Sequence, residues 1–268
     1  MNRIGYQAVH EAVGFGADAA PELATVRVLV AGGVELGRPS VTEGLTPLEM
    51  ARERGYATLE RVLTAADRHQ PSSDPDGALL AAAERGDADA VALALRDGAR
   101  IEARDGSGRT ALLLASSGDH VDAAQVLVAM GADPDALDDQ HDTPWLVTGV
   151  TGSVAMLEAL LPARPDLALV NRYGGVSVIP ASERGHVEYV RRVVSTGIDV
   201  NHVNSLGWTA LLEAVLLGDG GERHREIVRI LLEAGADPSI GDHDGITALE
   251  HAERMGFEGL ASVLRAGG

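Results

Sequence analysis

The sequence predicts an all-α fold, an α-solenoid of about eight helix-turn-helix repeats. A phrase of the type Thr-x-Leu-x-x-Ala recurs along the 268 residues, with anchors near residues 7, 46, 77, 110, 143, 176, 209 and 247. Four successive intervals between these anchors are 33 residues long, and a second apolar helix is predicted after each copy. Units of this size cannot bury their apolar faces alone, so neighbouring repeats must stack.

The first helix of each repeat should begin at the anchor. Thr is a good N-cap, and Pro47 and Pro144 lie at the first helical position, where no N–H is needed. Two residues after each anchor the side chain is apolar, and five residues after it the side chain is usually small. This pattern predicts a short helix packed closely on a neighbour. The apolar positions are Val9, Leu48, Leu79, Leu112, Trp145, Val178, Leu211 and Leu249.

The second helix of each repeat, for example residues 121–130 and 225–234, commonly ends at a glycine that can adopt left-handed backbone angles. A polar connector then leads to the next anchor. Two short insertions, residues 17–21 and 220–224, lengthen the intervals at the two ends of the chain and should form loops between paired helices.

The segments GRTALLLASSGDHVDAAQVLVAMGADPDALD and GADPSIGDHDGITALEHAERMG carry the G-x-T-P-L-H-x-A, mid-repeat Gly and G-A-D motifs of the ankyrin repeat family. The chain resembles this family over essentially its whole length. The resemblance implies an ankyrin-repeat α-solenoid, with antiparallel helix pairs stacked into a curved array and short β-hairpin-like fingers along its concave side. It predicts a single ankyrin-repeat array over residues 1–268, with a weak boundary at 68–77, where RHQPSSDPDG replaces the usual connector. It also implies that His120 and His186, in mid-repeat turns, are structural.

The charge balance bears on the class of partner. With 22 Lys and Arg against 40 Asp and Glu, the formal net charge is −18, which disfavours binding to nucleic acid or to an anionic membrane. A basic or zwitterionic protein surface fits better, as does simple solubility. The absence of cysteine excludes disulfides and thiolate sites. No signal pattern or membrane-spanning stretch is found in the sequence, so we expect a cytoplasmic protein.

The central repeats depart from the pattern. Trp145 replaces the usual Leu, Thr148 the Ala and Val176 the Thr cap, while Arg164 stands where a glycine should end a helix. Pro180 falls beyond the first helical position, so it should leave the Val176 carbonyl without a helical donor. Two interpretations remain open: drift of a degraded repeat, and a remodelled groove surface within residues 143–196.

The stretch DDQHDTPW at residues 138–145 concentrates three carboxylates and an imidazole. Asp138 lies five residues before its anchor, as Asp105, Asn204 and Asp242 do, and the family resemblance implies that it braces the loop. His141 occupies the glycine position of the turn. The neighbouring polar side chains should splay apart on a finger, which disfavours a metal or catalytic site there. The sequence contains no metal, cofactor or nucleophile motif, and no catalytic residue is assigned.

The fingertips are the predicted partner-binding surface, because the family generally presents the residues one, three and four before each anchor. Trp, Tyr and Arg are enriched at binding hot spots. The alternative is that Trp208 folds back onto the neighbouring finger. The predicted contacts are Asp139, Gln140, Asp142, Arg172, Tyr173, Leu206, Trp208, His243, Asp244 and Ile246.

The favoured function is a non-enzymatic protein–protein interaction module, or scaffold, that binds a partner through its concave groove and fingertips. The alternative is a small-molecule or atypical enzymatic site in the central repeats. There Trp145 would be an apolar wall, and His141, Asp142 and Tyr173 would supply polar or acid–base groups. Thr148 and Pro180 would complete this pocket. A weaker third hypothesis is an inhibitor that masks a basic protein, with the net charge as its only support. The sequence does not identify the partner or the oligomeric state.

Overall fold

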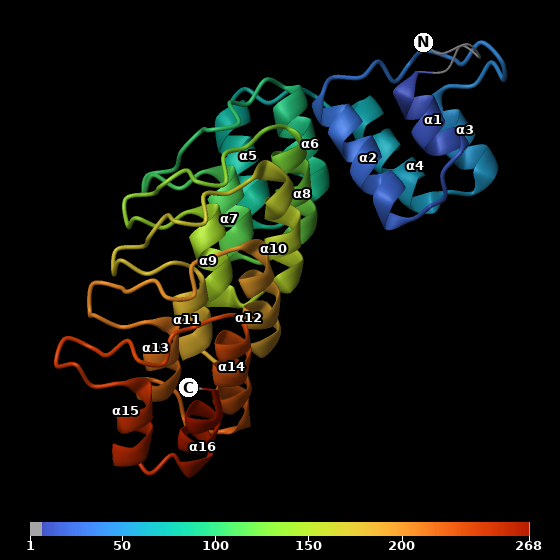
Figure 1. Ribbon diagram of the computed structural model, residues 1–268. Helices are drawn as coiled ribbons and strands as arrows, with labels where there is room; N and C mark the ends of the chain where they lie inside the picture. The colour runs from blue at the N-terminus through green and yellow to red at the C-terminus, as the bar shows by residue number, and fades with distance from the viewer. Residues whose placement is uncertain (1–6, 268) are drawn as a thin grey trace. The chain divides into compact units, whose positions relative to one another are not determined.

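The computed structural model describes residues 7–267, and within them the chain forms sixteen α-helices in eight consecutive pairs (Figure 1). The predicted all-α repeat fold is confirmed. The first helices of the pairs are α1 (Ala8–Gly14), α3 (Pro47–Arg54), α5 (Pro75–Glu84), α7 (Ala111–Ser117), α9 (Pro144–Thr151), α11 (Val178–Glu183), α13 (Ala210–Leu216) and α15 (Ala248–Arg254). The second helices are α2 (Ala20–Ala31), α4 (Ala57–Arg68), α6 (Ala88–Arg96), α8 (Val121–Ala129), α10 (Val154–Leu160), α12 (Val187–Val193), α14 (Glu222–Glu233) and α16 (Glu258–Gly267).

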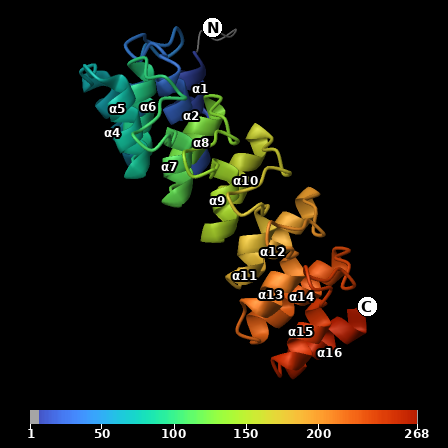
Figure 2. The ribbon, with the colours of Figure 1, turned by 90° about the vertical axis from the view of Figure 1, so that its left-hand side faces the viewer.

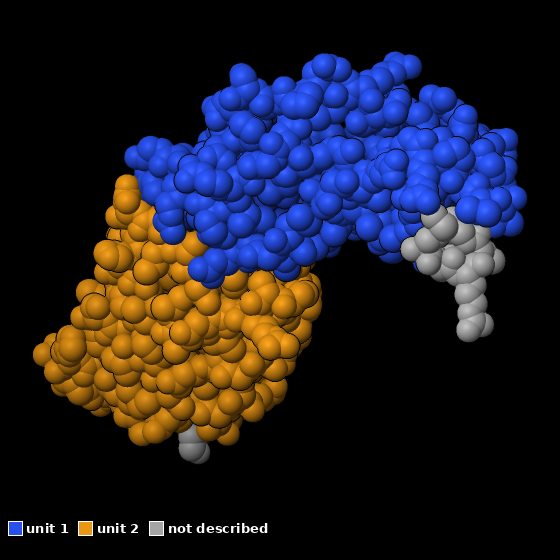
Figure 3. Space-filling view, turned by 90° about the horizontal axis from the view of Figure 1, so that it is seen from above, with its two compact units in different colours: residues 1–133 blue, residues 134–268 orange. Residues whose placement is uncertain are grey.

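Short 3-10 turns, η1 (Leu161–Ala163) and η2 (Val194–Thr196), extend two of the second helices. The chain divides into two compact units, residues 1–133 (unit 1) and residues 134–268 (unit 2), which are coloured separately in Figure 3. In unit 2 the first helices pack in sequence order: α11 contacts both α9 and α13, and α13 contacts α15 (Figures 1 and 2). No helix within residues 7–267 is long and apolar enough to cross a membrane.

The threonine caps explain where most first helices begin. In five repeats the threonine hydroxyl accepts a hydrogen bond from the backbone N–H three residues later, as the sequence predicts. These residues are Thr46, Thr110, Thr143, Thr209 and Thr247. The third repeat differs from its predicted anchor. Its helix α5 begins at Pro75, and the Asp74 carboxylate caps it by accepting from the Gly77 N–H at 3.0 Å.

Pro180 has no N–H to give the Val176 carbonyl, as predicted, but that carbonyl is not left unpaired. Helix α11 begins at Val178, so Pro180 is its third residue, and the N–H groups of the first helical turn have no intrahelical partner in any case. The Ile179 N–H donates to the Val176 carbonyl at 3.0 Å, which satisfies that acceptor. Arg164 does end its turn in the left-handed region, with φ 58°.

Three histidines between the paired helices, or at the start of the second one, tie their repeats to the previous repeat. The imidazole Nε2 of His120 lies 3.1 Å from the Glu84 carbonyl, and that of His186 lies 3.1 Å from the Val150 carbonyl, which fits the expected structural role. His224 makes the same contact with the Glu183 carbonyl at 2.9 Å. It lies inside α14, so the predicted loop at 220–224 is partly helical, and so is the loop at 17–21, because α2 begins at Ala20.

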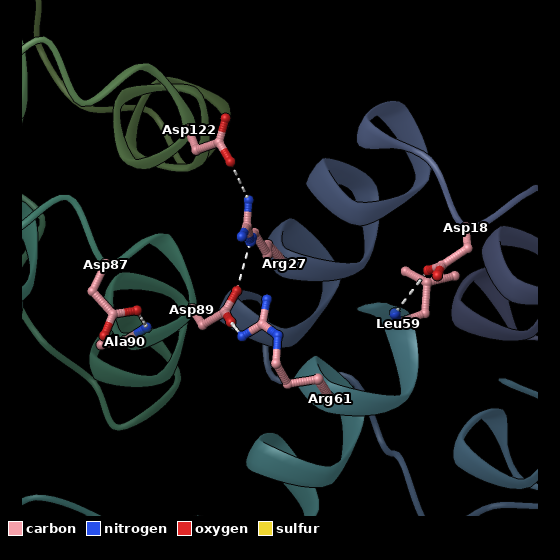
Figure 4. A network of polar contacts seen from close by, with 8 residues as sticks. All are labelled: Asp18, Arg27, Leu59, Arg61, Asp87, Asp89, Ala90 and Asp122. Carbon is pink, nitrogen blue, oxygen red and sulfur yellow. Dashed lines mark hydrogen bonds and ion pairs between the residues drawn. The ribbon is translucent and has the colours of Figure 1, made fainter. Parts of the chain in front are cut away.

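The packing order changes inside unit 1. Helix α2 packs against α6 and α8, two and three repeats further along the chain, as well as against α4. Figure 4 shows the polar contacts of this junction: the Arg27 guanidinium donates to Asp89 at 2.7 Å and to Asp122 at 2.8 Å. Arg61 from α4 also binds Asp89. The stretch 68–77 therefore lies within a compact unit, but at the place where the packing departs from simple neighbour order.

Candidate functional site

Each finger of unit 2 is held by a single side chain at its start. The Oδ1 atoms of Asp138, Asn171, Asn204 and Asp242 each accept hydrogen bonds from the backbone N–H groups two and four residues later, at 2.8–3.0 Å. This geometry is the bracing role expected for Asp138. His141 adopts φ 59° in the turn of its finger, as its glycine position predicts.

The predicted contact residues differ in how far they reach solvent. Seven are exposed: Asp139, Gln140, Arg172, Tyr173, Leu206, His243 and Asp244. Asp142, Trp208 and Ile246 are half-buried. Tyr173 is 57% exposed and Leu206 is 49% exposed, and they lie on neighbouring fingers. The backbones of these two fingers are joined directly, because the Ser205 N–H donates to the Tyr173 carbonyl at 2.9 Å.

A hollow of about 450 Å³ lies beside these fingers, between them and helices α9, α11 and α13. We call it the unit 2 groove. Its apolar walls are Val147, Val150, Ile179, Pro180, Leu206 and Leu217, with Tyr173 at the finger side. Its polar lining consists of Asp142, Asn171, Arg172, Glu183, Arg184, Asn204 and Glu213. The groove thus combines apolar contact area with charged groups of both signs.

At the finger side of the groove the charges are paired. The Arg172 guanidinium lies 3.3 Å from the Asp142 carboxylate and 4.9 Å from the centre of the Tyr173 ring. It also reaches the Gln140 side-chain carbonyl at 3.4 Å. Burial raises the pKa of Asp142, and the nearby Arg172 charge only partly offsets this effect. Two predicted contact residues, Arg172 and Asp142, are therefore paired with each other in the free protein.

Glu213 is the residue of this site that the sequence analysis missed. It lies on α13, is 6% exposed, and its Oε1 accepts a hydrogen bond from Asn204 Nδ2 at 2.7 Å. Burial and the nearby Glu183 charge raise the pKa of Glu213 to about 7. A sequence signal existed: in the last repeat the equivalent pair is His251 and Asp242, joined at 2.7 Å. In the repeat anchored at Thr209, Glu213 takes the place of the histidine and Asn204 the place of the aspartate.

The alternative central pocket does not form around Trp145. Trp145 and Thr148 are fully buried and do not line the groove. The Thr148 hydroxyl donates to the Trp145 carbonyl at 2.7 Å and lies 2.7 Å from the hydroxyl of the buried Tyr189. Compared with the usual Leu and Ala of the repeat, Trp145 and Thr148 fill the core with a larger side chain and a more polar one. His141 is exposed outside the groove, and only Asp142, Tyr173 and Pro180 of the proposed pocket contribute to its lining.

Other hollows have fewer charged side chains in their lining. A hollow of about 600 Å³ in unit 1, between α2 and α8, has no titratable side chain in its lining. Another of about 470 Å³ lies between α14 and α16, with Arg229 and Glu233 as its charged groups. No group of three or more metal-ligating side chains occurs in the part of the chain that the structure describes. The unit 2 groove is lined by four of the ten predicted contact residues, Asp142, Arg172, Tyr173 and Leu206, and the other six lie outside its lining.

Comparison with known proteins gives consistent matches. A family model described as ankyrin repeats (3 copies) matches residues 49–138, 145–242 and 181–267. Ankyrin repeat protein YahD of Escherichia coli (strain K12) is 42% identical over 190 residues, covering 70% of this chain and 94% of that protein. An L-asparaginase of Dirofilaria immitis is 31% identical over 183 residues, which are 68% of this chain but 30% of that protein. The crystal structure of an ankyrin repeat domain from Acinetobacter baumannii AYE is similar with a TM-score of 0.69 and 43% identity, covering 73% of this chain and 98% of that one.

Proposed function

We propose that this chain, which belongs to the ankyrin repeat family, binds another protein through the unit 2 groove and the fingers beside it, without catalysing a reaction. The observation that carries the proposal is the set of exposed apolar side chains around the groove: Tyr173, Leu206, Leu217 and Val150 are 57%, 49%, 49% and 39% exposed. Apolar side chains on braced fingers lose little entropy on binding, and such patches commonly mark protein interfaces.

The net charge of −18 supports a partner with a basic surface, since attraction between opposite charges speeds the encounter of two proteins. A small-molecule site in the central repeats has less support. Its proposed apolar wall, Trp145, is inside the core, and the Asp142 carboxylate that would act as an acid or base is paired with Arg172. The groove itself remains available for an extended segment of a partner.

The proposal is tested by affinity purification with the whole chain as bait, at low and at high salt. We expect one dominant protein to be retained, and less of it at high salt. The double variant Tyr173→Ala/Leu206→Ala should bind that protein at least about tenfold more weakly, because it removes a candidate hot-spot tyrosine and the exposed apolar side chain on the next finger. The control is Val41→Ala, which truncates a 74% exposed side chain in unit 1.

Both variants should have the thermal unfolding midpoint of the unsubstituted chain, since the substituted side chains are largely exposed. Calorimetry with the captured protein then separates a binding defect from a folding defect. Equal affinity of the double variant and the unsubstituted chain would place the interface elsewhere and would rule out the groove as the binding surface. Trp208→Ala is a second probe, with a smaller expected effect because Trp208 is half-buried and does not line the groove.

A further inference from the structure

Glu213 is the buried charged residue of the groove lining. It is 6% exposed, and its one hydrogen-bond partner within the described residues, Asn204, is neutral and binds Oε1. Oε2 accepts no hydrogen bond from any part of the chain that the structure describes, although Glu213 lines the groove. A buried carboxylate without a compensating cation is costly, so this position favours a ligand that supplies positive charge.

No cation within residues 7–267 supplies that charge. Glu183, on the neighbouring helix α11, is the charged group that acts on Glu213, and it has the same sign. Arg172 is already engaged by Asp142. Arg184 lines the groove but is exposed, and no attraction from it opposes the raised pKa of Glu213. On α15, which packs against the other side of α13, His251 is bound to Asp242 at 2.7 Å.

The surroundings of Glu213 suit a long side chain with a charged end. Leu206 and Leu217 line the same groove and are each 49% exposed. Lysine and arginine place their aliphatic stems along apolar surface of this kind while the charged group reaches a polar partner. A small inorganic cation would gain nothing from the two leucines.

We infer that the unit 2 groove recognises a lysine or arginine side chain of the protein partner, whose charged group binds Glu213 and Glu183 while its stem lies against Leu206 and Leu217. This inference rests on the proposed function, because the side chain belongs to a partner segment held in the groove. It adds a specificity: a segment without a basic residue at this place would leave the buried carboxylate unpaired.

The direction of the pH dependence follows. The bound form requires ionised Glu213, and the pKa of Glu213 is about 7 in the free protein. At about pH 8 the carboxylate is ionised and ready to bind, whereas at about pH 6 it is protonated and the partner's charge must first displace a proton. Binding should therefore weaken as pH falls through 7, and it should release a proton near neutral pH.

The experiment selects ligands from a random peptide library with the full chain at about pH 8. Groove-dependent peptides are those that the Tyr173→Ala/Leu206→Ala variant no longer retains. In synthetic copies, each lysine is replaced by norleucine and each arginine by citrulline, which keep the length and remove the charge. Affinities are measured by fluorescence anisotropy for the unsubstituted chain, for Glu213→Gln and for Glu188→Gln. Glu188 is exposed on α12 and does not line the groove, so its variant controls for the loss of one charge.

We expect one basic residue of each groove-dependent peptide to be essential. Its neutral replacement and Glu213→Gln should each lower affinity at least about tenfold at pH 8, and Glu188→Gln should not. With Glu213→Gln the weakening between pH 8 and pH 6 should disappear. Groove-dependent peptides that tolerate norleucine or citrulline and bind Glu213→Gln normally would overturn this inference and leave the proposed function intact. Recovery of no groove-dependent peptide would count against both.

Discussion

Asn204 makes two kinds of contact at one position. Its Oδ1 braces the finger by accepting from the N–H groups of Leu206 and Trp208, and its Nδ2 donates to Glu213 at 2.7 Å. The equivalent residues of two other fingers in unit 2, Asp138 and Asp242, are aspartates, which brace equally well but cannot donate. The amide at position 204 therefore allows a buried carboxylate to lie beside the finger.

Asn204→Asp should destabilise the protein in a pH-dependent way. At about pH 8 the new carboxylate would face ionised Glu213, and we expect the free energy of unfolding to fall by about 1–3 kcal/mol. At about pH 5 Glu213 is protonated, because its pKa is about 7, and can donate to the aspartate, so the loss should be small. Urea unfolding at the two pH values measures this difference.

Asn171→Asp is the matched control. Asn171 braces its finger with the same two hydrogen bonds through Oδ1, but makes no contact with a buried carboxylate. Its substitution should change stability by less than about 0.5 kcal/mol at either pH, as is usual for a replacement without a disturbed partner. A pH-independent loss in Asn204→Asp, or an equal loss in Asn171→Asp, would contradict the assigned coupling between Asn204 and Glu213.

At the scale of single helices, Gly149 is required by the close approach of α9 and α11. A Cβ atom at this position would lie 2.0 Å from the Ser177 carbonyl oxygen, which is backbone and cannot rotate away. Helix propensity alone would favour Gly149→Ala by about 1 kcal/mol. We expect the clash to dominate and the free energy of unfolding to fall by about 1–3 kcal/mol.

Gly175→Ala tests the same region without the clash. Its Cβ atom would meet nothing closer than 3.6 Å, so its effect on the urea unfolding midpoint should be much smaller. Comparison of the two unfolding midpoints shows whether the loss comes from the contact between α9 and α11 or whether any added methyl group in the central repeats destabilises the protein. A Gly149→Ala variant that is as stable as the unsubstituted chain would show that α9 and α11 can separate without cost.

The docking of α2 onto α6 and α8 depends on Arg27. It is 8% exposed and bridges Asp89 and Asp122, which lie on those two helices. Arg27→Met keeps most of the aliphatic stem but removes both charge-assisted hydrogen bonds. We expect it to destabilise the docked arrangement by about 2 kcal/mol, seen as faster hydrogen exchange of the α2 amides. Arg52→Met, which breaks an exposed pair with Glu60, should cost at most about 1 kcal/mol. Equal exchange in α2 for both variants would contradict the role of Arg27.

The elements that sequence reasoning predicted are those whose cause is local. A threonine cap bonds an N–H three residues away, and the Asp138 brace bonds groups two and four residues away, so both appear in a short stretch of sequence. The α5 start was also recognisable, since Asp74 followed by Pro75 is an ordinary cap and first residue. The docking of α2 was not, because the partners of Arg27 lie 62 and 95 residues along the chain.

The groove shows the same limit. Its finger residues could be placed from their distance to each anchor. Glu213 was missed although its position relative to Asn204 matches that of His251 relative to Asp242, because a glutamate on a first helix is ordinary until burial and the neighbouring Glu183 are known. Trp145 had two interpretations, an apolar packing position of the repeat and the wall of the alternative pocket. A large aromatic side chain can either fill the core or line a pocket, and only its burial distinguishes the two.

At the scale of the whole molecule, the 33-residue spacing predicts that residues 1–268 form one array. The anchors at 110, 143 and 176 continue this spacing past residue 134, where unit 2 begins. In a single array, stability is a sum of repeat and nearest-neighbour terms, so a defect in one part lowers the stability of the rest. If the two units fold independently, a defect in one unit would not change the stability of the other.

Leu79→Ala tests that prediction. Leu79 is fully buried in unit 1, and its truncation should cost about 2–5 kcal/mol. Both tryptophans of the chain, Trp145 and Trp208, belong to unit 2, so their fluorescence reports the unfolding of that unit in urea. If the chain is one array, Leu79→Ala should lower the midpoint seen by tryptophan fluorescence, together with the midpoint seen by circular dichroism. Val41→Ala, at an exposed position of unit 1, should leave both midpoints in place. A fluorescence midpoint that does not move while the circular dichroism curve splits into two steps would mean that the two units fold separately.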